Sequence, residues 1–197
     1  MKILQNVVLI IRFPFLLPRN RWTGKVNNWG RFIKYIKEGK YKQAFNEPYF
    51  FQYTELDSMP DGWRKVFGVQ MCRDIKKALL KKGLKCLYSY RISEIKEKWG
   101  YLHWYDFGAT EEVHKVIQHY EWLSMCYCIH CGKPVRYMTQ GWIEYVCEDC
   151  AKEFIKPEYI EECRLTEDDI PQFCHYDSEG NKTEIDLEVD FKKMWNV

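Results

Sequence analysis

Cys128-Ile-His-Cys131 and Cys147-Glu-Asp-Cys150 are two cysteine pairs separated by 15 residues. This spacing matches the four-thiolate pattern of a zinc ribbon, in which each pair closes a tight knuckle and the intervening segment folds back as a hairpin. Residues 134–139 and 142–146 are the expected strands of that hairpin. Four thiolates complete the tetrahedral coordination of Zn²⁺ and leave no position for water. One structural zinc ion is therefore expected at Cys128, Cys131, Cys147 and Cys150.

Two further donors lie beside the first pair, Cys126 and His130. Either of them could replace a ligand or lie next to the metal site. The alternative is that Cys126 ends a buried helix and that His130 is an exposed residue of the knuckle. Gly132 directly follows the pair, where a knuckle turn often requires a positive φ that only glycine adopts at little cost.

The composition is that of a folded globular protein, with 46% hydrophobic and 17% aromatic residues among 197. The five cysteines outside the two pairs form no regular framework, which favours a reducing cytoplasm over a disulfide scaffold. The apolar run 6–11 is followed by Arg12 and no cleavage site, so it is not expected to be a signal peptide. It is also too short to span a bilayer. We expect a buried strand or a short core helix there, with an interfacial membrane anchor as the lesser alternative.

Charge is unevenly distributed along the chain, although the net charge is only +2. Residues 152–197 carry 13 acidic and 6 basic side chains, so the preceding residues 1–151 carry an excess of 9 positive charges. This asymmetry indicates a polyanion-binding body with an acidic tail. An ordinary solvated surface would explain each half on its own.

The predicted fold class is α+β, with a small antiparallel sheet, two main amphipathic helices and an inserted zinc ribbon. Residues 1–125 form the α+β body with a basic, aromatic N-terminal lead-in, 126–151 the zinc ribbon, and 152–197 an acidic extension with a β-hairpin. The first main helix is expected to begin with Asp61 as its N-cap and to end at Gly83. The second is expected after Thr110, which can cap a helix whose apolar stripe runs through 113–123.

Alternating apolar and polar residues predict strands over 84–92 and 101–107, with 96–100 between them. A short helix is expected within 29–45, although Gly30 and Gly39 weaken it. In the tail, 173–177 and 183–189 are expected to form a hairpin whose apolar face carries Ile185, Leu187 and Val189.

Four segments of the chain, 13–25, 54–68, 92–105 and 128–150, together show a familiar arrangement. It resembles a group of small proteins encoded by bacteriophages and prophages, which share a strand–turn–strand like Ile95-Lys-Glu-Lys-Trp-Gly-Tyr-Leu102, an amphipathic helix and a C-terminal four-cysteine zinc ribbon. The resemblance covers residues 13–151 and leaves out the acidic tail. It implies a phage or prophage origin and action in the cytoplasm of a bacterial host cell, and it transfers no catalytic residues.

Nucleic acid is the first predicted partner, because zinc ribbons often present a hairpin to nucleic acid or its polymerases and because the body is basic. The candidate contact residues interleave cations with aromatic rings. They are Arg19, Arg21, Trp22, Lys25, Arg91, Lys96, Lys98, Trp99 and Arg136. The alternative is a phage-encoded inhibitor that binds a host defence or polymerase protein directly.

Catalysis is the third hypothesis, and no deaminase, metalloprotease, nucleotide-binding or dinucleotide-binding motif supports it. Four carboxylates, Glu94, Glu97, Asp106 and Glu111, could hold Mg²⁺ as in a metal-dependent nuclease, although scattered solvated acids explain them equally well. We therefore expect a protein that acts by binding.

Overall fold

The computed structural model describes residues 2–20, 23, 25–26, 29–46, 52–166, 174–176 and 182–184. Its fold is α+β, as predicted. In chain order the helices and strands are α1 (Lys2–Arg12), α2 (Trp29–Lys37), α3 (Tyr41–Asn46), α4 (Asp61–Trp63), α5 (Val69–Lys81), α6 (Leu84–Ser89), β1 (Arg91–Lys98), β2 (Tyr101–Phe107), α7 (Glu111–Leu123), β3 (Tyr137–Met138), β4 (Tyr145–Val146), α8 (Glu148–Phe154), β5 (Cys174–Tyr176) and β6 (Lys182–Glu184).

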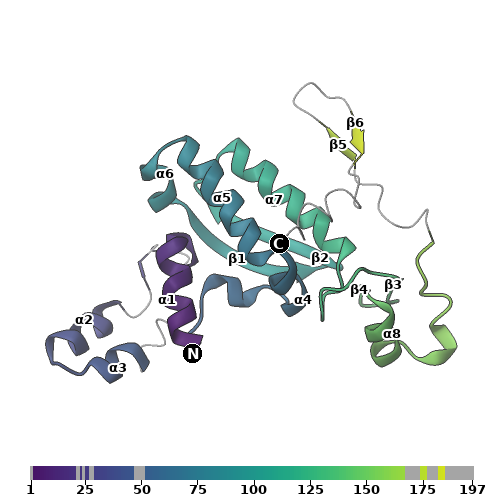
Figure 1. The fold of residues 1–197 in the computed structure, drawn as a ribbon, viewed down its shortest axis with the longest axis horizontal. Coiled ribbons are helices and arrows are strands. Elements are labelled where there is room, and N and C mark those ends of the chain that lie inside the picture. Colours follow the sequence, from purple (N-terminus) through teal and green to yellow (C-terminus); the bar gives the residue numbers. More distant parts are fainter. Residues whose placement is uncertain are drawn as a thin grey trace.

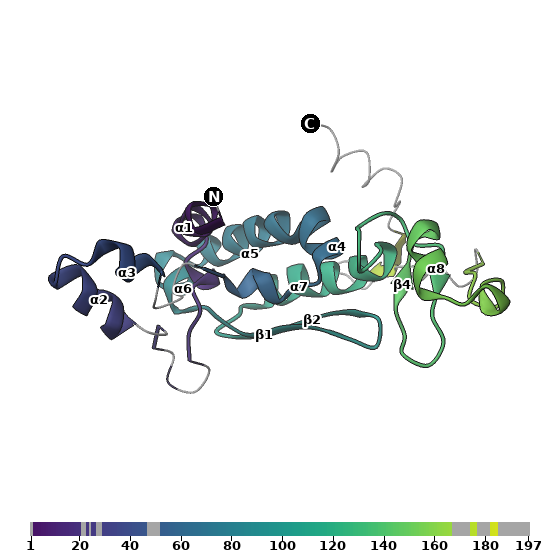
Figure 2. The same ribbon diagram turned by 90° about the horizontal axis from the view of Figure 1, so that it is seen from below.

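The antiparallel hairpin β1–β2 lies against α5 and α7, which cover one of its faces (Figure 1, Figure 2). Side chains alternate across a strand, and the inner positions Ile95 on β1 and Leu102 and Trp104 on β2 are buried. A register shift between Ile92 and Glu94 brings Ile92 to the same buried face, three residues before Ile95. The opposite face of the hairpin carries no helix in the described part of the chain (Figure 2).

Both main amphipathic helices form where the sequence predicts them. Thr110 caps α7, because its hydroxyl oxygen accepts a hydrogen bond from the backbone N–H of Val113. The other helix begins at Asp61, but Pro60 occupies the N-cap position and the Asp61 carboxylate pairs with Arg64 instead. A π-helical turn, Arg64–Gly68, then joins α4 to α5.

The strand predicted over 84–92 is wrong, because most of this segment is the helix α6. Leu84 and Tyr88, two of the residues expected to form one buried strand face, are 64% and 65% exposed. Leu87 and Tyr90 are buried, and their spacing of three residues suits a helical turn better than a strand. The first strand therefore begins at Arg91 and extends through 96–98, which were expected to belong to the turn.

At the N-terminal end, α1 is helical but is not a core helix. Asn6 is its only buried residue, whereas Leu4 and Ile11 are 70% and 73% exposed. The helix expected within 29–45 is two helices, α2 and α3, divided at Gly39, which has φ +69°. No helix in the described ranges has the length and apolar character needed to cross a membrane.

The outer edge of β2 is closed by side chains of the segment that ends α7. The Leu102 N–H donates to Ser124 Oγ at 2.8 Å, and the Trp104 N–H donates to Glu121 Oε1 at 2.9 Å. Ser124 is fully buried. These bonds satisfy donors that an edge strand would otherwise leave unpaired.

Ser124→Ala is expected to lower the free energy of unfolding by about 1–3 kcal/mol, because it leaves the Leu102 N–H buried without an acceptor. Chemical denaturation measures the change. Ser89→Ala is the matched control, since Ser89 is exposed and bonds only to its own helix at Cys86; a loss below about 0.5 kcal/mol is expected there. Equal losses in the two variants would contradict this account of the edge.

The acidic tail contains the predicted β-hairpin, in which β5 and β6 pair antiparallel with Cys174 opposite Glu184. The expected apolar face at Ile185, Leu187 and Val189 lies outside the described residues.

Candidate metal centre and binding face

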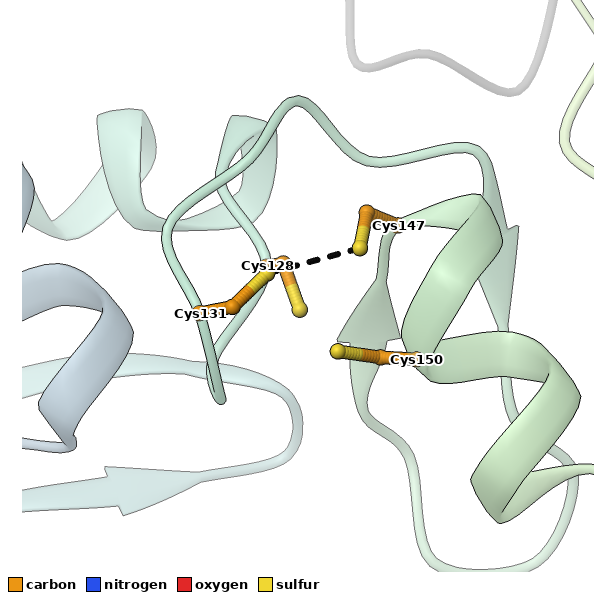
Figure 3. A group of neighbouring side chains, drawn as sticks. All are labelled: Cys128, Cys131, Cys147 and Cys150. Atoms are coloured by element: carbon orange, nitrogen blue, oxygen red, sulfur yellow. Dashed lines mark hydrogen bonds between the residues drawn. The ribbon is translucent and has the colours of Figure 1, made fainter.

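The first cysteine pair forms the predicted knuckle. The Gly132 N–H donates to the Cys128 carbonyl oxygen at 2.9 Å, and the Cys128 N–H donates to that of Lys133 at 2.7 Å. Gly132 has φ +84°, as the sequence predicted for this turn. Both bonds hold the loop closed, so that Cys128 and Cys131 face the same space (Figure 3).

The second pair is not a second knuckle, contrary to the prediction. After the expected hairpin, in which Tyr137 pairs with Val146, the chain enters α8 directly. Cys147 is the N-cap residue of this helix and Cys150 lies in its first turn. Two acidic residues, Glu148 and Asp149, occupy that first turn, where the helix dipole favours negative charge.

The four sulfur atoms converge between the knuckle and α8, and all lie within 4.8 Å of one another (Figure 3). Cys131 Sγ and Cys147 Sγ are 3.4 Å apart. This is the only group of metal-binding side chains among the residues that the structure describes, and neither Cys126 nor His130 belongs to it. His130 instead pairs with Glu144 at 3.0 Å and stacks on the ring of Phe154.

The electrostatics of the four thiols suit a cation. Burial tends to raise the pKa of Cys128, but hydrogen bonds from the backbone of Cys131, Cys147 and His130 bring that pKa below its ordinary value. Burial and the neighbouring thiols raise the pKa of Cys150. Four thiolates at this separation would repel one another, and a divalent cation among them removes that cost. The donor set therefore fits a metal ion.

The knuckle is packed tightly against α4 of the body. The Gly62 N–H donates to the Ile129 carbonyl oxygen at 2.9 Å, and the indole N–H of the buried Trp63 donates to that of Tyr127 at 2.9 Å. Glycine at position 62 allows this approach, because a Cβ there would lie 2.6 Å from the Ile129 oxygen and would overlap with the Cys128 oxygen. The knuckle that carries the first cysteine pair is therefore in direct contact with the body.

A second feature is the uncovered side of β1–β2, which we call the open hairpin face. On this face every β2 residue has an aromatic side chain, and most β1 residues are cationic. The cross-strand pairs are Arg91 with Phe107, Glu94 with Tyr105, Lys96 with His103, and Lys98 with Tyr101. Neighbouring β2 rings lie close together, with centroids 4.3 Å apart for Tyr101 and His103 and 5.9 Å apart for His103 and Tyr105.

Each cation of this face lies over an aromatic ring. Lys96 Nζ is 5.4 Å from the ring centroid of Tyr105, and Lys98 Nζ is 4.2 Å from that of Trp99. Arg91 Cζ is 5.6 Å from that of Phe107. Burial and the charges of both lysines lower the pKa of His103, although hydrogen bonding of its ring N–H to the Lys98 backbone and the charge of Glu97 act in the opposite direction.

Several of the predicted contact residues are brought together here. Arg91, Lys96, Lys98 and Trp99 belong to one hairpin. Arg19 lies near Arg91, and burial, together with the charge of Arg91, lowers the pKa of Arg19. Lys25 is exposed and lies on the same loop as Arg19. The loop is closed by a hydrogen bond from the Asn20 N–H to the Lys25 carbonyl oxygen.

The remaining candidates lie elsewhere in the fold or outside the described residues. Arg136 directly precedes β3; its N–H donates to the Val146 carbonyl oxygen, and its own carbonyl oxygen accepts from the Leu165 N–H. Arg21 and Trp22 are outside the described residues.

The four carboxylates considered for Mg²⁺ do not form a metal-binding group in the described part of the chain. Glu94 pairs with Lys96 at 2.9 Å on the open hairpin face, and Glu97 accepts from the Gly100 N–H at 2.7 Å. Asp106 and Glu111 line a separate hollow.

The surface aromatics Tyr101, Tyr105 and Phe107 were missed as candidate contact residues, although they alternate along the sequence. The signal was ambiguous because Leu102 and Trp104, on the other side of the strand, are also apolar. Hydrophobic patterning alone could not decide which side faces the helices.

Comparison with protein-family models, with curated proteins and with solved structures found no match for this chain.

Proposed function

We propose that this is a non-catalytic, phage-type nucleic-acid-binding protein that acts in the bacterial cytoplasm, with one structural Zn²⁺ ion. Zinc is favoured because four cysteine donors in a closed cluster suit its tetrahedral preference and leave no open position for a substrate. The metal centre then has an architectural role: it fixes the knuckle, which packs on α4.

The observation that carries the nucleic-acid proposal is the open hairpin face. Cations supply phosphate contacts, and exposed rings supply surfaces on which bases stack. Tyr105 and Phe107 are 41% and 47% exposed, so their rings are available to a ligand. Glu94 is the one acidic residue in this array, and its pairing with Lys96 partly offsets its charge.

Combined replacement of Arg91, Lys96 and Lys98 by Gln is expected to weaken nucleic-acid binding at least tenfold. If each cation contacts one phosphate of a single strand, the wild-type slope of log Kobs against log salt includes about −2 from these three, which the variant loses. Fluorescence anisotropy over a salt series measures both quantities.

The matched control removes the same charge elsewhere, by Gln at Lys34 and Lys37 of α2 and Lys152 of α8, and should keep the wild-type slope. A wild-type affinity that does not change with salt would contradict the proposal. A host protein that co-purifies after nuclease treatment, with no oligonucleotide binding, would support the direct inhibitor instead.

A further inference from the structure

The turn that joins β1 to β2 has an unusual residue at its tip. Trp99 has φ +56° and Gly100 has φ +86°, so both central residues of this two-residue turn adopt positive φ. Such turns favour Asn or Gly at the first position, because a side chain with a bulky Cβ substituent is strained there. Trp99 is the only non-glycine residue with positive φ in the described part of the chain.

Burial within this chain does not offset that strain, because the Trp99 side chain is 67% exposed. Instead, the Lys98 ammonium lies over the Trp99 ring in a cation–π contact, with Nζ 4.2 Å from the ring centroid. A strained, exposed residue of this kind suggests a function rather than a role in stability. An indole with a cation at one face offers a stacking surface and a phosphate contact together.

A second exposed indole lies on the neighbouring turn. A Cβ on Gly100 would lie 2.9 Å from Ile143 Cγ2 and 3.0 Å from Tyr145 Cε2, so the hairpin tip is seated against the β3–β4 hairpin (Figure 2). Trp142, which precedes Ile143, is 74% exposed. Thr139 holds this turn in place, since its hydroxyl oxygen accepts from the Glu144 N–H at 2.8 Å.

We infer that the two adjoining turns form a stacking site for unpaired bases, so that the ligand is single-stranded DNA or RNA. This inference rests on the proposed function and specifies its substrate class. Bases within a duplex already stack on one another and present only their edges, whereas unpaired bases have free faces for Trp99 and Trp142. From Trp99, the rings and cations of the open hairpin face continue along β1 and β2. The remaining nucleotides of the ligand can bind there.

Trp99→Asn is the decisive variant, because stability and binding should change in opposite directions. Asn suits positive φ, so the denaturation midpoint should stay equal or rise. Affinity for a labelled oligomer of about 12 thymidines or uridines should fall roughly tenfold, as expected for the loss of one stacked base. Trp142→Ser should also weaken binding. Tyr88→Asn removes a side chain that is 65% exposed on α6 and should change nothing.

The possible outcomes distinguish failure of the stacking site from failure of the proposed nucleic-acid binding. Unchanged single-strand affinity in Trp99→Asn would overturn the stacking site and leave nucleic-acid binding intact. Duplex of the same length bound as tightly as the single strand by wild-type protein would overturn the single-strand class. Failure of wild-type protein to bind any of these probes would overturn the proposed function itself. Tighter binding of the uridine oligomer than of the thymidine oligomer would identify RNA, rather than DNA, as the ligand.

Discussion

Removal of the metal ion is expected to unfold the segment from Cys128 to Cys150 and to destabilise the helical body that it contacts. Apparent zinc-binding free energies of small four-ligand sites are about 10–16 kcal/mol, which is as large as the whole stability of a typical domain, about 5–15 kcal/mol. The effect should reach α4, because Trp63 and Gly62 both donate hydrogen bonds to the chain that leads into the knuckle. We expect one equivalent of zinc in the purified protein and a fall in Tm of more than about 10 °C in excess chelator.

Single cysteine variants separate metal loss from general damage. Cys131→Ser removes a ligand that is only partly buried, so it should lose zinc and reproduce the chelator effect. Cys126→Ser should keep one equivalent of zinc, because Cys126 is not part of the four-sulfur group. Cys86→Ser, a partly exposed thiol on α6, should keep both zinc and Tm. Full zinc content in Cys131→Ser, or a Tm insensitive to chelator, would rule out this metal centre.

The cysteine group was predictable because its signal is local and chemical. Two pairs at this spacing have few other uses, and the structure gathers the same four residues. Helix α7 was equally accessible, since Thr110 and one apolar stripe define its start and its buried side. In both cases the residues that specify the feature lie within one short segment.

Errors arose where two readings fit the same short pattern. Cys147-Glu-Asp-Cys150 suits either a knuckle or the start of a helix, and the choice depends on whether the following residues continue into α8. The segment 84–89 shows apolar residues at alternate positions, yet Leu87, which breaks that alternation, is the buried one. Short apolar runs do not distinguish a strand from a helical turn without tertiary contacts.

Gly62 shows a different limit, because its environment is formed by residues distant in sequence. Next to Pro60 and Asp61, it resembles an ordinary turn residue that marks the start of a helix. Its actual role is to admit the carbonyl groups of Cys128 and Ile129, more than 60 residues away in the chain. No pattern around position 62 could have indicated this contact.

Gly62→Ala is therefore expected to destabilise the protein, although helix propensity alone predicts the opposite. Ala is favoured over Gly inside a helix by about 1 kcal/mol. The added Cβ, however, would overlap with the Cys128 oxygen and lie 2.6 Å from the Ile129 oxygen, and both are backbone atoms. Neither can yield easily, because the Cys128 N–H is bonded to Lys133 and the Ile129 N–H to Tyr145. Overpacking of this kind costs about 3 kcal/mol, so the clash outweighs propensity.

Gly30→Ala in α2 is the matched control, since no atom lies within 4 Å of a Cβ built there. It should leave the free energy of unfolding unchanged or raise it by about 0.5–1 kcal/mol. The zinc content of Gly62→Ala should remain at one equivalent, because all four ligands are intact; this separates a displaced interface from a lost metal. A Gly62→Ala variant as stable as Gly30→Ala would mean that the knuckle does not pack on α4. The metal centre would then act as an independent module, and its removal would leave the body folded.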